Sequence, residues 1–410
     1  MTALLPAGLA IRVFLAFASA YFMSYALRSV NAVIAPDLVA EFDLSNAQLG
    51  ALSSAYFLAF AAMQMPLVVW LDRFRSRRVD AALLLVAAVG CAVFATARDA
   101  SVLWIGRALI GIGVSGALMA SLRAFRFWYA PARQQQLAAW MLVAGTLGAL
   151  ATTVPVQLAL PLIGWRGVFG LSAVLLCACS VAIRLQLPAE PMRAGHDEGP
   201  AWSAYRQVYG DRYFWRFGVI AFAVQSSFVA FQGLWIGPWL RSVLGMDASS
   251  TARVLFLFNL VLTMGYLALG WSLPKLLRRG WTTPRLVAAG VSAMLCLELS
   301  IAFADGPYAW LLWLGLALAA TANSLAQTHV SLSFPAGLTG RAFTAYNLLS
   351  MSGMFLMQWL FGVVVDMMSA GGEHSAEGFR RAMLAWVAMQ AMALAVLVFW
   401  RVQPRGKVPA

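Results

Sequence analysis

The chain has 410 residues, of which 62% are hydrophobic and 11% are charged, and it carries a formal net charge of +13. Apolar runs of about twenty residues recur along it, and each run is long enough to cross a bilayer as a helix. A soluble core cannot use a dozen such segments, which excludes a soluble enzyme. The arginines lie in the polar breaks, where they act as orientation signals, so the positive charge does not indicate a nucleic-acid partner.

In chain order, we predict spans over residues 10–35, 47–71, 79–97, 102–127, 136–160, 167–187, 215–240, 252–274, 284–304, 308–334, 343–368 and 380–401. The longest polar stretch separates the sixth span from the seventh. We therefore expect an all-α membrane fold of twelve transmembrane helices in two six-helix bundles related by a pseudo-two-fold axis. The expected parts are an N-terminal bundle over 1–187, a linker over 188–214, a second bundle over 215–402 and a tail over 403–410.

The distribution of arginine and lysine predicts the orientation of the chain. If the N-terminus is inside, the inner loops hold roughly three times as many basic residues as the outer loops. The inner turn after the second span alone contains Arg73, Arg75, Arg77 and Arg78. An even number of spans then places both termini in the cytoplasm.

Two motifs with fixed spacing point to a known family. The turn Asp72-Arg73-Phe74-Arg75-Ser76-Arg77-Arg78 resembles the inner-loop motif of the major facilitator superfamily, with Val68 and Arg75 in place of its two glycines. The fourth span is similar to the family's Arg-xxx-Gly-x-Gly pattern at Arg107, Gly111 and Gly113. Further matches lie at Arg126–Arg133 and at Gly164-Trp165-Arg166.

This resemblance implies two helix bundles around a central cavity, lined by spans 1, 4, 7 and 10, and transport by alternating access. It also implies that Asp72 and Arg73 form a gate on the cytoplasmic side. No nucleotide-binding or zinc-protease motif is present in the sequence. We therefore expect a monomeric secondary transporter of a bacterial inner membrane, and neither an enzyme nor a cofactor-binding protein. Its expected partners are a small-molecule substrate, the lipid bilayer and a coupling ion, either a proton or sodium.

Arg28 is the main candidate for substrate binding, because charge inside a membrane is costly and needs a reason. The pattern Tyr21-xxx-Tyr25-xx-Arg28-xx-Asn31 places these side chains on one face of the first helix. A guanidinium can pair a carboxylate at two points, so the pattern favours an organic anion. The segment also resembles the Asp-Arg-x-x-Asn element of the anion:cation symporter branch, with Leu27 in place of the acid. The alternative is a structural arginine that reaches towards the outer interface.

Other polar groups in the predicted spans are weaker candidates. We expect substrate contacts from Arg107, Gln232, Trp235, Tyr346 and Asn347. His329 is a candidate for proton coupling, since imidazole titrates near neutral pH. Glu298 lies on a peripheral helix, where we expect it near the outer headgroups.

Several alternatives to anion transport remain open. The chain could export amphipathic compounds, although the fifth span lacks the Gly-Pro pattern of the drug:proton antiporters that the family contains. Met351, Met354 and Met357 have a spacing that would suit copper, but methionine is also an ordinary membrane-core residue, and we predict no metal site. A membrane sensor that no longer transports is the remaining alternative.

Overall fold

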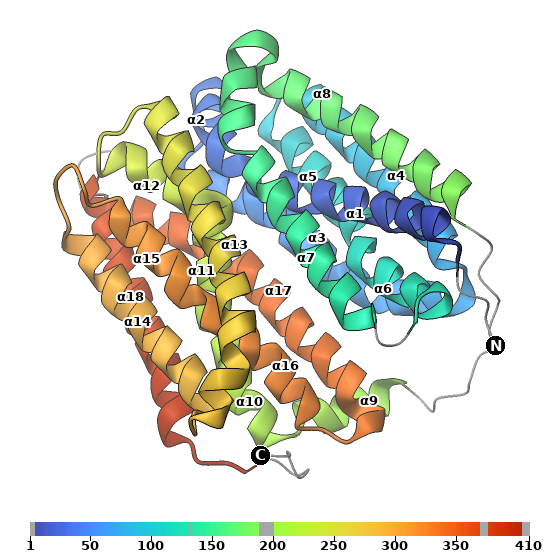
Figure 1. The fold of residues 1–410 in the computed structure, drawn as a ribbon. Helices are drawn as coiled ribbons and strands as arrows, with labels where there is room; N and C mark the ends of the chain where they lie inside the picture. The colour runs from blue at the N-terminus through green and yellow to red at the C-terminus, as the bar shows by residue number, and fades with distance from the viewer. Residues whose placement is uncertain (1–4, 131–132, 188–200, 370–375, 404–410) are drawn as a thin grey trace. The chain divides into compact units, whose positions relative to one another are not determined.

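The computed structural model describes residues 5–130, 133–187, 201–369 and 376–403, without the side chains of 72, 135, 201–203 and 336. These residues form helices and no strand, so the predicted all-α fold class is confirmed for the described part of the chain. The chain divides into two compact units (Figure 1). The first comprises Met1–Asp43 and Leu52–Asp197, and the second comprises Leu44–Ala51 and Glu198–Ala410.

The first unit holds the helices that precede the linker, together with most of α3. These are α1 (Ala7–Ser29), α2 (Asn31–Phe42), α3 (Asn46–Arg73), α4 (Ser76–Ala95), α5 (Ala100–Val114), α6 (Ala117–Trp128), α7 (Gln134–Ala151) and α8 (Val154–Gln186).

The second unit holds the start of α3 and all later helices. These are α9 (Ala201–Tyr209), α10 (Arg212–Val219), η2 (Ile220–Gln225), α11 (Ser226–Ala230), η3 (Phe231–Trp235), α12 (Ile236–Ser242), α13 (Ala248–Arg278), α14 (Thr283–Phe303), α15 (Leu311–Ala320), η4 (Thr321–Asn323), α16 (Ser324–Leu332), α17 (Ala336–Met368) and α18 (Ala376–Phe399).

Ten helical segments of the described chain are long and apolar enough to cross a membrane. Two predicted spans fall outside this set because their helices are interrupted. The fifth ends as α7 at Ala151, before the non-helical Thr153, and α8 then continues through a kink at Gly164, where φ is +64°. The tenth is divided by η4, a 3₁₀ turn.

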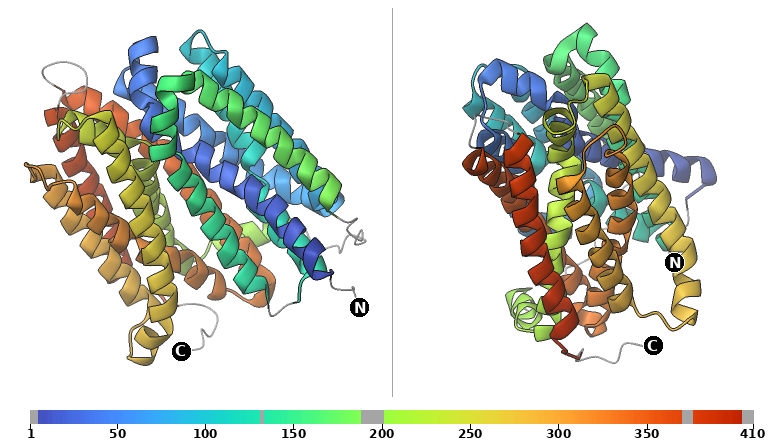
Figure 2. Two further views of the ribbon diagram at one scale, coloured as in Figure 1. Left: turned by 45° about the horizontal axis from the view of Figure 1, so that its top comes forward. Right: turned by 90° about the vertical axis from the view of Figure 1, so that its left-hand side faces the viewer.

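The first unit is held together by helices that approach at glycine. Helix α4 packs against α5 and α8, and α1 packs against α7 (Figures 1 and 2). A Cβ on Gly113 of α5 would lie 2.2 Å from the backbone nitrogen of Ala87, and one on Gly148 of α7 would lie 2.1 Å from the carbonyl oxygen of Phe22. Only glycine allows these backbones so close together, which explains the glycines of the fourth-span motif.

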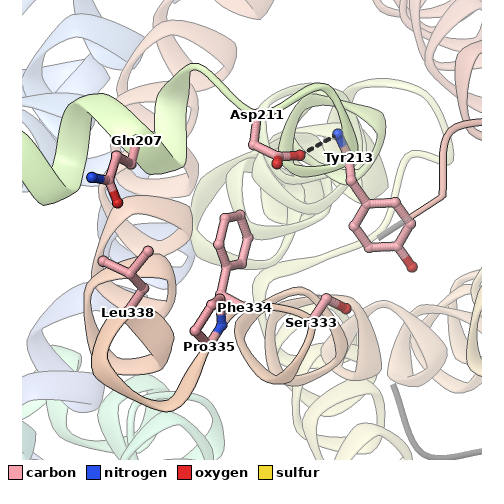
Figure 3. Close-up of a pocket in the computed structure, with 7 residues that line it drawn as sticks. All are labelled: Gln207, Asp211, Tyr213, Ser333, Phe334, Pro335 and Leu338. Atoms are coloured by element: carbon pink, nitrogen blue, oxygen red, sulfur yellow. Dashed lines mark hydrogen bonds between the residues drawn. The ribbon is translucent and has the colours of Figure 1, made fainter. Parts of the chain in front are cut away.

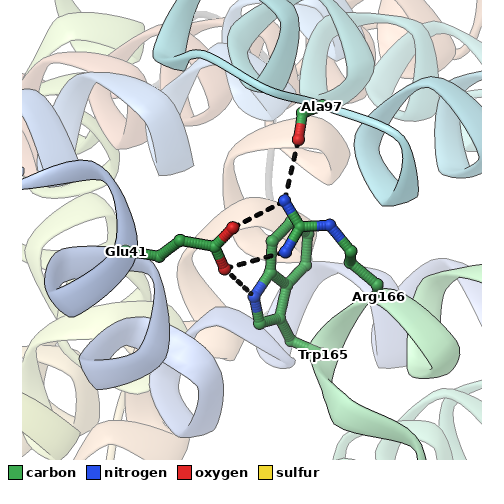
Figure 4. A network of polar contacts seen from close by, with 4 residues as sticks. All are labelled: Glu41, Ala97, Trp165 and Arg166. Atoms are coloured by element: carbon green, nitrogen blue, oxygen red, sulfur yellow. Dashed lines mark hydrogen bonds and ion pairs between the residues drawn. The ribbon is translucent and has the colours of Figure 1, made fainter.

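One end of the first unit is tied by an ion pair between α2 and α8 (Figure 4). Arg166 Nη2 lies 2.6 Å from Glu41 Oε1, and Trp165 donates its indole N–H to Glu41 Oε2 at 2.9 Å. Arg166 also donates to the carbonyl of Ala97. The hydrogen bond from Arg166 is the largest cause of a lowered pKa at Glu41. The Gly-Trp-Arg segment noted in the sequence therefore closes this end of the unit.

In the second unit, Asp366 near the end of α17 caps the first turn of α3. Its Oδ1 accepts from the backbone N–H and the side chain of Asn46, at 3.2 and 2.7 Å, and its Oδ2 accepts from the N–H of Ala47 at 2.7 Å. A Cβ on Gly362 would lie 2.2 Å from the carbonyl oxygen of Asn46, so the two backbones are in direct contact. A carboxylate at a helix N-terminus satisfies free N–H groups and favours the helix dipole.

Candidate functional site

Arg28 lies near the end of α1 with its charge uncompensated. Its guanidinium is 5.2 Å from the centroid of the Tyr25 ring and 5.4 Å from that of Phe57 on α3. No carboxylate pairs with it among the described residues, and its side chain is only half-buried. Two aromatic faces thus hold a cation whose N–H groups remain available to an anion.

Arg107 on α5 is a second cation of the first unit, but it is enclosed. It is 1% exposed, donates to the carbonyl of Leu27 at 2.8 Å and lies 5.4 Å from the centroid of the Tyr56 ring. Its Nε has no partner in the described structure, and no carboxylate pairs with it there. The hydroxyl of Tyr56 donates to the carbonyl of Ser24 at 3.2 Å. Arg107 therefore links α5 to α1 at Leu27, the residue before Arg28, and adds positive charge to the same unit.

The predicted stripe on the first helix is only partly accessible. Tyr25 and Arg28 are half-buried, whereas Tyr21 and Asn31 are buried. The Tyr21 and Tyr25 rings meet edge to face with centroids 5.0 Å apart. Asn31, at the start of α2, donates to Ser53 Oγ at 2.7 Å, and its Oδ1 has no partner among the described residues. The structure brings Tyr25 and Arg28 together and turns Asn31 towards α3.

In the second unit, two of the side chains predicted to contact substrate form hydrogen bonds to other residues of the protein. Gln232 donates to Asn259 Oδ1 at 2.9 Å. Trp235 is 1% exposed, and its indole N–H donates to the carbonyl of Gln358 at 3.0 Å. Tyr346 is fully buried and its hydroxyl lacks a partner in the described structure, whereas Asn347 is half-buried. The side chain of Gln232 is thus more accessible than that of Trp235.

The seventh predicted span contains two π-helical segments, η2 and η3, on either side of α11. Such segments occur often at functional sites, because they shift the side chains that follow. Gln232 lies in η3, and Gln225 at the end of η2 has a side-chain oxygen without a partner in the described chain. This helix therefore presents polar groups from an irregular backbone.

His329 on α16 bonds to Tyr213 on α10, with 2.8 Å between its Nε2 and the tyrosine hydroxyl. Close by, a cavity of about 210 Å³ is lined by Gln207, Asp211, Tyr213, Ser333, Phe334, Pro335 and Leu338 (Figure 3). Asp211 accepts there from the backbone N–H of Tyr213, so its carboxylate caps α10. His329 is consequently part of a local hydrogen-bonded cluster in the second unit.

The predicted gate is described in part. Arg73 is exposed in the last turn of α3, and the side chain of Asp72 lies outside the described residues. Phe57 was not anticipated from the sequence, because a phenylalanine in an apolar run gives no sign of the arginine beside it. Asp366 was likewise not recognised as a helix cap, since its partners are 319 and 320 residues away in the chain.

With this geometry established, comparison with known proteins defines the class. Residues 17–358 match the model of the Major Facilitator Superfamily, and the chain belongs to that family. A bacterial homologue of the human lysosomal transporter Spinster, solved in an inward-facing and unoccupied conformation, has a similar structure with a TM-score of 0.78 and 17% identity, over 96% of this chain and 97% of the other. A D-xylose–proton symporter gives a TM-score of 0.76 and 16% identity over 98% and 100%. These likenesses support the fold.

Two relatives are similar in sequence. A protein described as a probable sulfoacetate transporter of Cupriavidus necator is 31% identical over 150 residues, which are 36% of this chain and 35% of the relative. The chain thus spans about a third of that relative's length. A purine ribonucleoside efflux pump of Salmonella paratyphi B is 24% identical over 279 residues, 63% of this chain and 67% of the relative. Both relatives are described as transporters, which agrees with the family of this chain and with the ten described helical segments long and apolar enough to cross a membrane.

Proposed function

We propose that the protein is a secondary transporter that moves a small carboxylate-bearing anion across a bacterial inner membrane by alternating access. The observation that carries this proposal is Arg28, which has no carboxylate partner among the described residues and lies beside the rings of Tyr25 and Phe57, in a helix long and apolar enough to cross a membrane. A charge inside a membrane is costly unless it is compensated, and a transported anion would supply the compensation. The similarity to a probable sulfoacetate transporter supports the same class of substrate.

The orientation and the coupling ion are part of this proposal. We propose that both termini are cytoplasmic, because arginine and lysine are enriched in the loops on that side. Asp72 and Arg73 would then form a cytoplasmic gate. Leu27 stands where the related symporters have an acid, and its carbonyl accepts from Arg107. A coupling proton or sodium would therefore bind elsewhere, and His329 is the proposed proton carrier.

A thermal-shift screen of organic anions on the purified protein tests the proposal. A ligand present at 100 times its Kd should stabilise the native state by about 2.7 kcal/mol. Compounds that stabilise the wild type are then tested for flux into proteoliposomes, and both signals should disappear in Arg28→Ala. Arg98→Ala is the matched control, since it removes an exposed arginine that lies outside the candidate spans of the same unit. Equal transport by Arg28→Ala and wild type would refute an anion site at Arg28.

A second candidate is export of a neutral solute, which the similarity to a purine ribonucleoside efflux pump favours. The same screen separates the two candidates. Stabilisation by ribonucleosides that persists in Arg28→Ala would support the second candidate, whereas stabilisation by carboxylates that depends on Arg28 would support the first.

A further inference from the structure

A buried carboxyl group and a buried amide meet between two peripheral helices of the second unit. Glu298 lies on α14 and Gln390 on α18, and the two helices pack side by side (Figure 1). Both side chains are 0% exposed. Gln390 donates from Nε2 to Glu298 Oε2 at 2.6 Å. Glu298 therefore faces α18 and is covered within the second unit, and its expected position near the outer headgroups stays a prediction.

Each of these two side chains also has an oxygen without a partner. Glu298 Oε1 and Gln390 Oε1 are both buried and accept no hydrogen bond from the described residues. The amide N–H of Gln390 already bonds to Glu298 Oε2, so the contact between the two side chains lacks a hydrogen for these two oxygens. A buried acceptor without a donor costs free energy, and a buried carboxylate without a cation costs more.

Among the described residues, no cation pairs with Glu298. On α18, Arg380 and Arg381 are about 15 and 13 Å along the axis from Gln390 at the α-helical rise, and they pair with Asp305 and Glu377. Helix α15 and η4 carry no titratable side chain. On α16, His329 bonds to Tyr213.

On α14 itself, Arg285 lies about 20 Å from Glu298 along the axis, and Cys296 is exposed. Within the described part of the chain, the carboxyl group therefore has an amide as its partner and no cation.

We propose that Glu298 is a proton-binding site, and that its bound proton closes a cyclic acid–amide pair with Gln390. The carboxylic acid O–H then donates from Oε1 to the amide oxygen, while the amide N–H donates to Oε2. One proton satisfies both unpartnered oxygens and removes the buried charge. Loss of the proton breaks one of the two hydrogen bonds and leaves a carboxylate between α14 and α18.

The proton therefore acts as a clamp between these helices. With the proton bound, the contact is neutral and doubly hydrogen-bonded. At alkaline pH the clamp is released, and the α14–α18 contact weakens. This inference concerns the second unit alone and does not depend on the identity of the substrate.

Infrared spectroscopy of the protein in lipid tests protonation directly. A protonated carboxylic acid has a carbonyl stretch that disappears when it ionises. We expect such a band to remain at neutral pH, where exposed acids are ionised, and to be lost in Glu298→Gln. Asp80→Asn is the matched control, because Asp80 is the other carboxyl group with 0% exposure in the described structure, and neither of its oxygens has a partner there. A Glu298 band that survives in Glu298→Gln, or is absent from wild type, overturns the proposal.

Thermal unfolding against pH tests the clamp. The wild-type melting temperature should fall from mildly acidic to mildly alkaline pH, and this fall should be smaller in Glu298→Gln, whose amide pair keeps two hydrogen bonds without titrating. The exchanged pair, Glu298→Gln with Gln390→Glu, rebuilds an acid and an amide and should restore both the band and the pH dependence. Identical pH profiles for wild type and Glu298→Gln contradict the clamp even if both proteins fold normally.

Discussion

Replacement of Gly111 by alanine tests whether the glycines of the fourth-span motif set the position of the arginine site. A Cβ on Gly111 would lie 2.2 Å from the carbonyl oxygen of Tyr56 and 3.0 Å from its carbonyl carbon and Cα. These are backbone atoms of α3, which cannot rotate out of the way. Tyr56 also supplies the ring beneath Arg107, so a shift of α3 at this point changes the surroundings of that guanidinium.

The size of the effect follows from these distances. Ordinary contact begins at 3.4 Å, so the two helices must separate by about 1.2 Å at this point. Overpacking of this kind costs about 1–3 kcal/mol. Gly170 on α8 is the matched control, since nothing lies within 4 Å of a Cβ placed there. Alanine at Gly170 should stabilise the helix by about 0.5–1 kcal/mol.

Thermal unfolding in detergent provides the assay. We expect the order of stability to be Gly170→Ala, then wild type, then Gly111→Ala, with transport reduced in Gly111→Ala alone. If both alanine variants unfold at or above the wild-type temperature, the close approach of α5 to α3 does not exist as described.

The remaining predictions concern the arginine site and two helix ends. Arg28→Lys keeps the charge but loses the planar pair of donors, so carboxylate binding should weaken by about 1–2 kcal/mol, or roughly 5- to 30-fold, in a calorimetric titration while the melting temperature is unchanged. The lowered pKa of Glu41 means that its pairing with Arg166 adds stability above the ordinary carboxyl range and loses it as the pH falls through the folded-state pKa. Glu41→Gln should therefore cost up to about 1 kcal/mol at neutral pH, since the pair is partly exposed, and should match wild type in acid. Asp366→Ala removes the cap on α3 and should cost about 0.5–2 kcal/mol in equilibrium unfolding, whereas an unchanged midpoint would contradict the cap.

The all-α membrane class was predictable because apolar runs of bilayer length dominate the sequence. The interruptions within the helices were not predictable to the same degree. The end of α7 before Thr153 and the turn at Gly164 depend on backbone angles within a stretch that remains apolar. The π segments of the seventh span contain no proline, and the single glycine in η3, Gly233, does not separate that segment from α-helix.

For the candidate site, the sequence predicted contacts within a single helix but not contacts between helices. Helical spacing placed Tyr25 beside Arg28, and the structure describes that contact. The neighbours contributed by other helices, such as Phe57 beside Arg28, required the tertiary fold. The partner of Glu298 could not be predicted for the same reason. Gln390 is 92 residues away in the chain, and a single acid in an apolar run does not indicate which residue it contacts.

The central claim is that the charge of Arg28 selects an organic anion. A thermodynamic cycle of binding free energies, with two ligands and two protein variants, tests this claim most directly. Calorimetry would measure a carboxylate substrate and its neutral carboxamide analogue against wild type and Arg28→Gln. The account predicts a coupling energy of about 1.5–3 kcal/mol between the carboxylate and the guanidinium, the range for hydrogen bonds to charged groups. A coupling energy near zero, with both ligands losing affinity equally in Arg28→Gln, would contradict it.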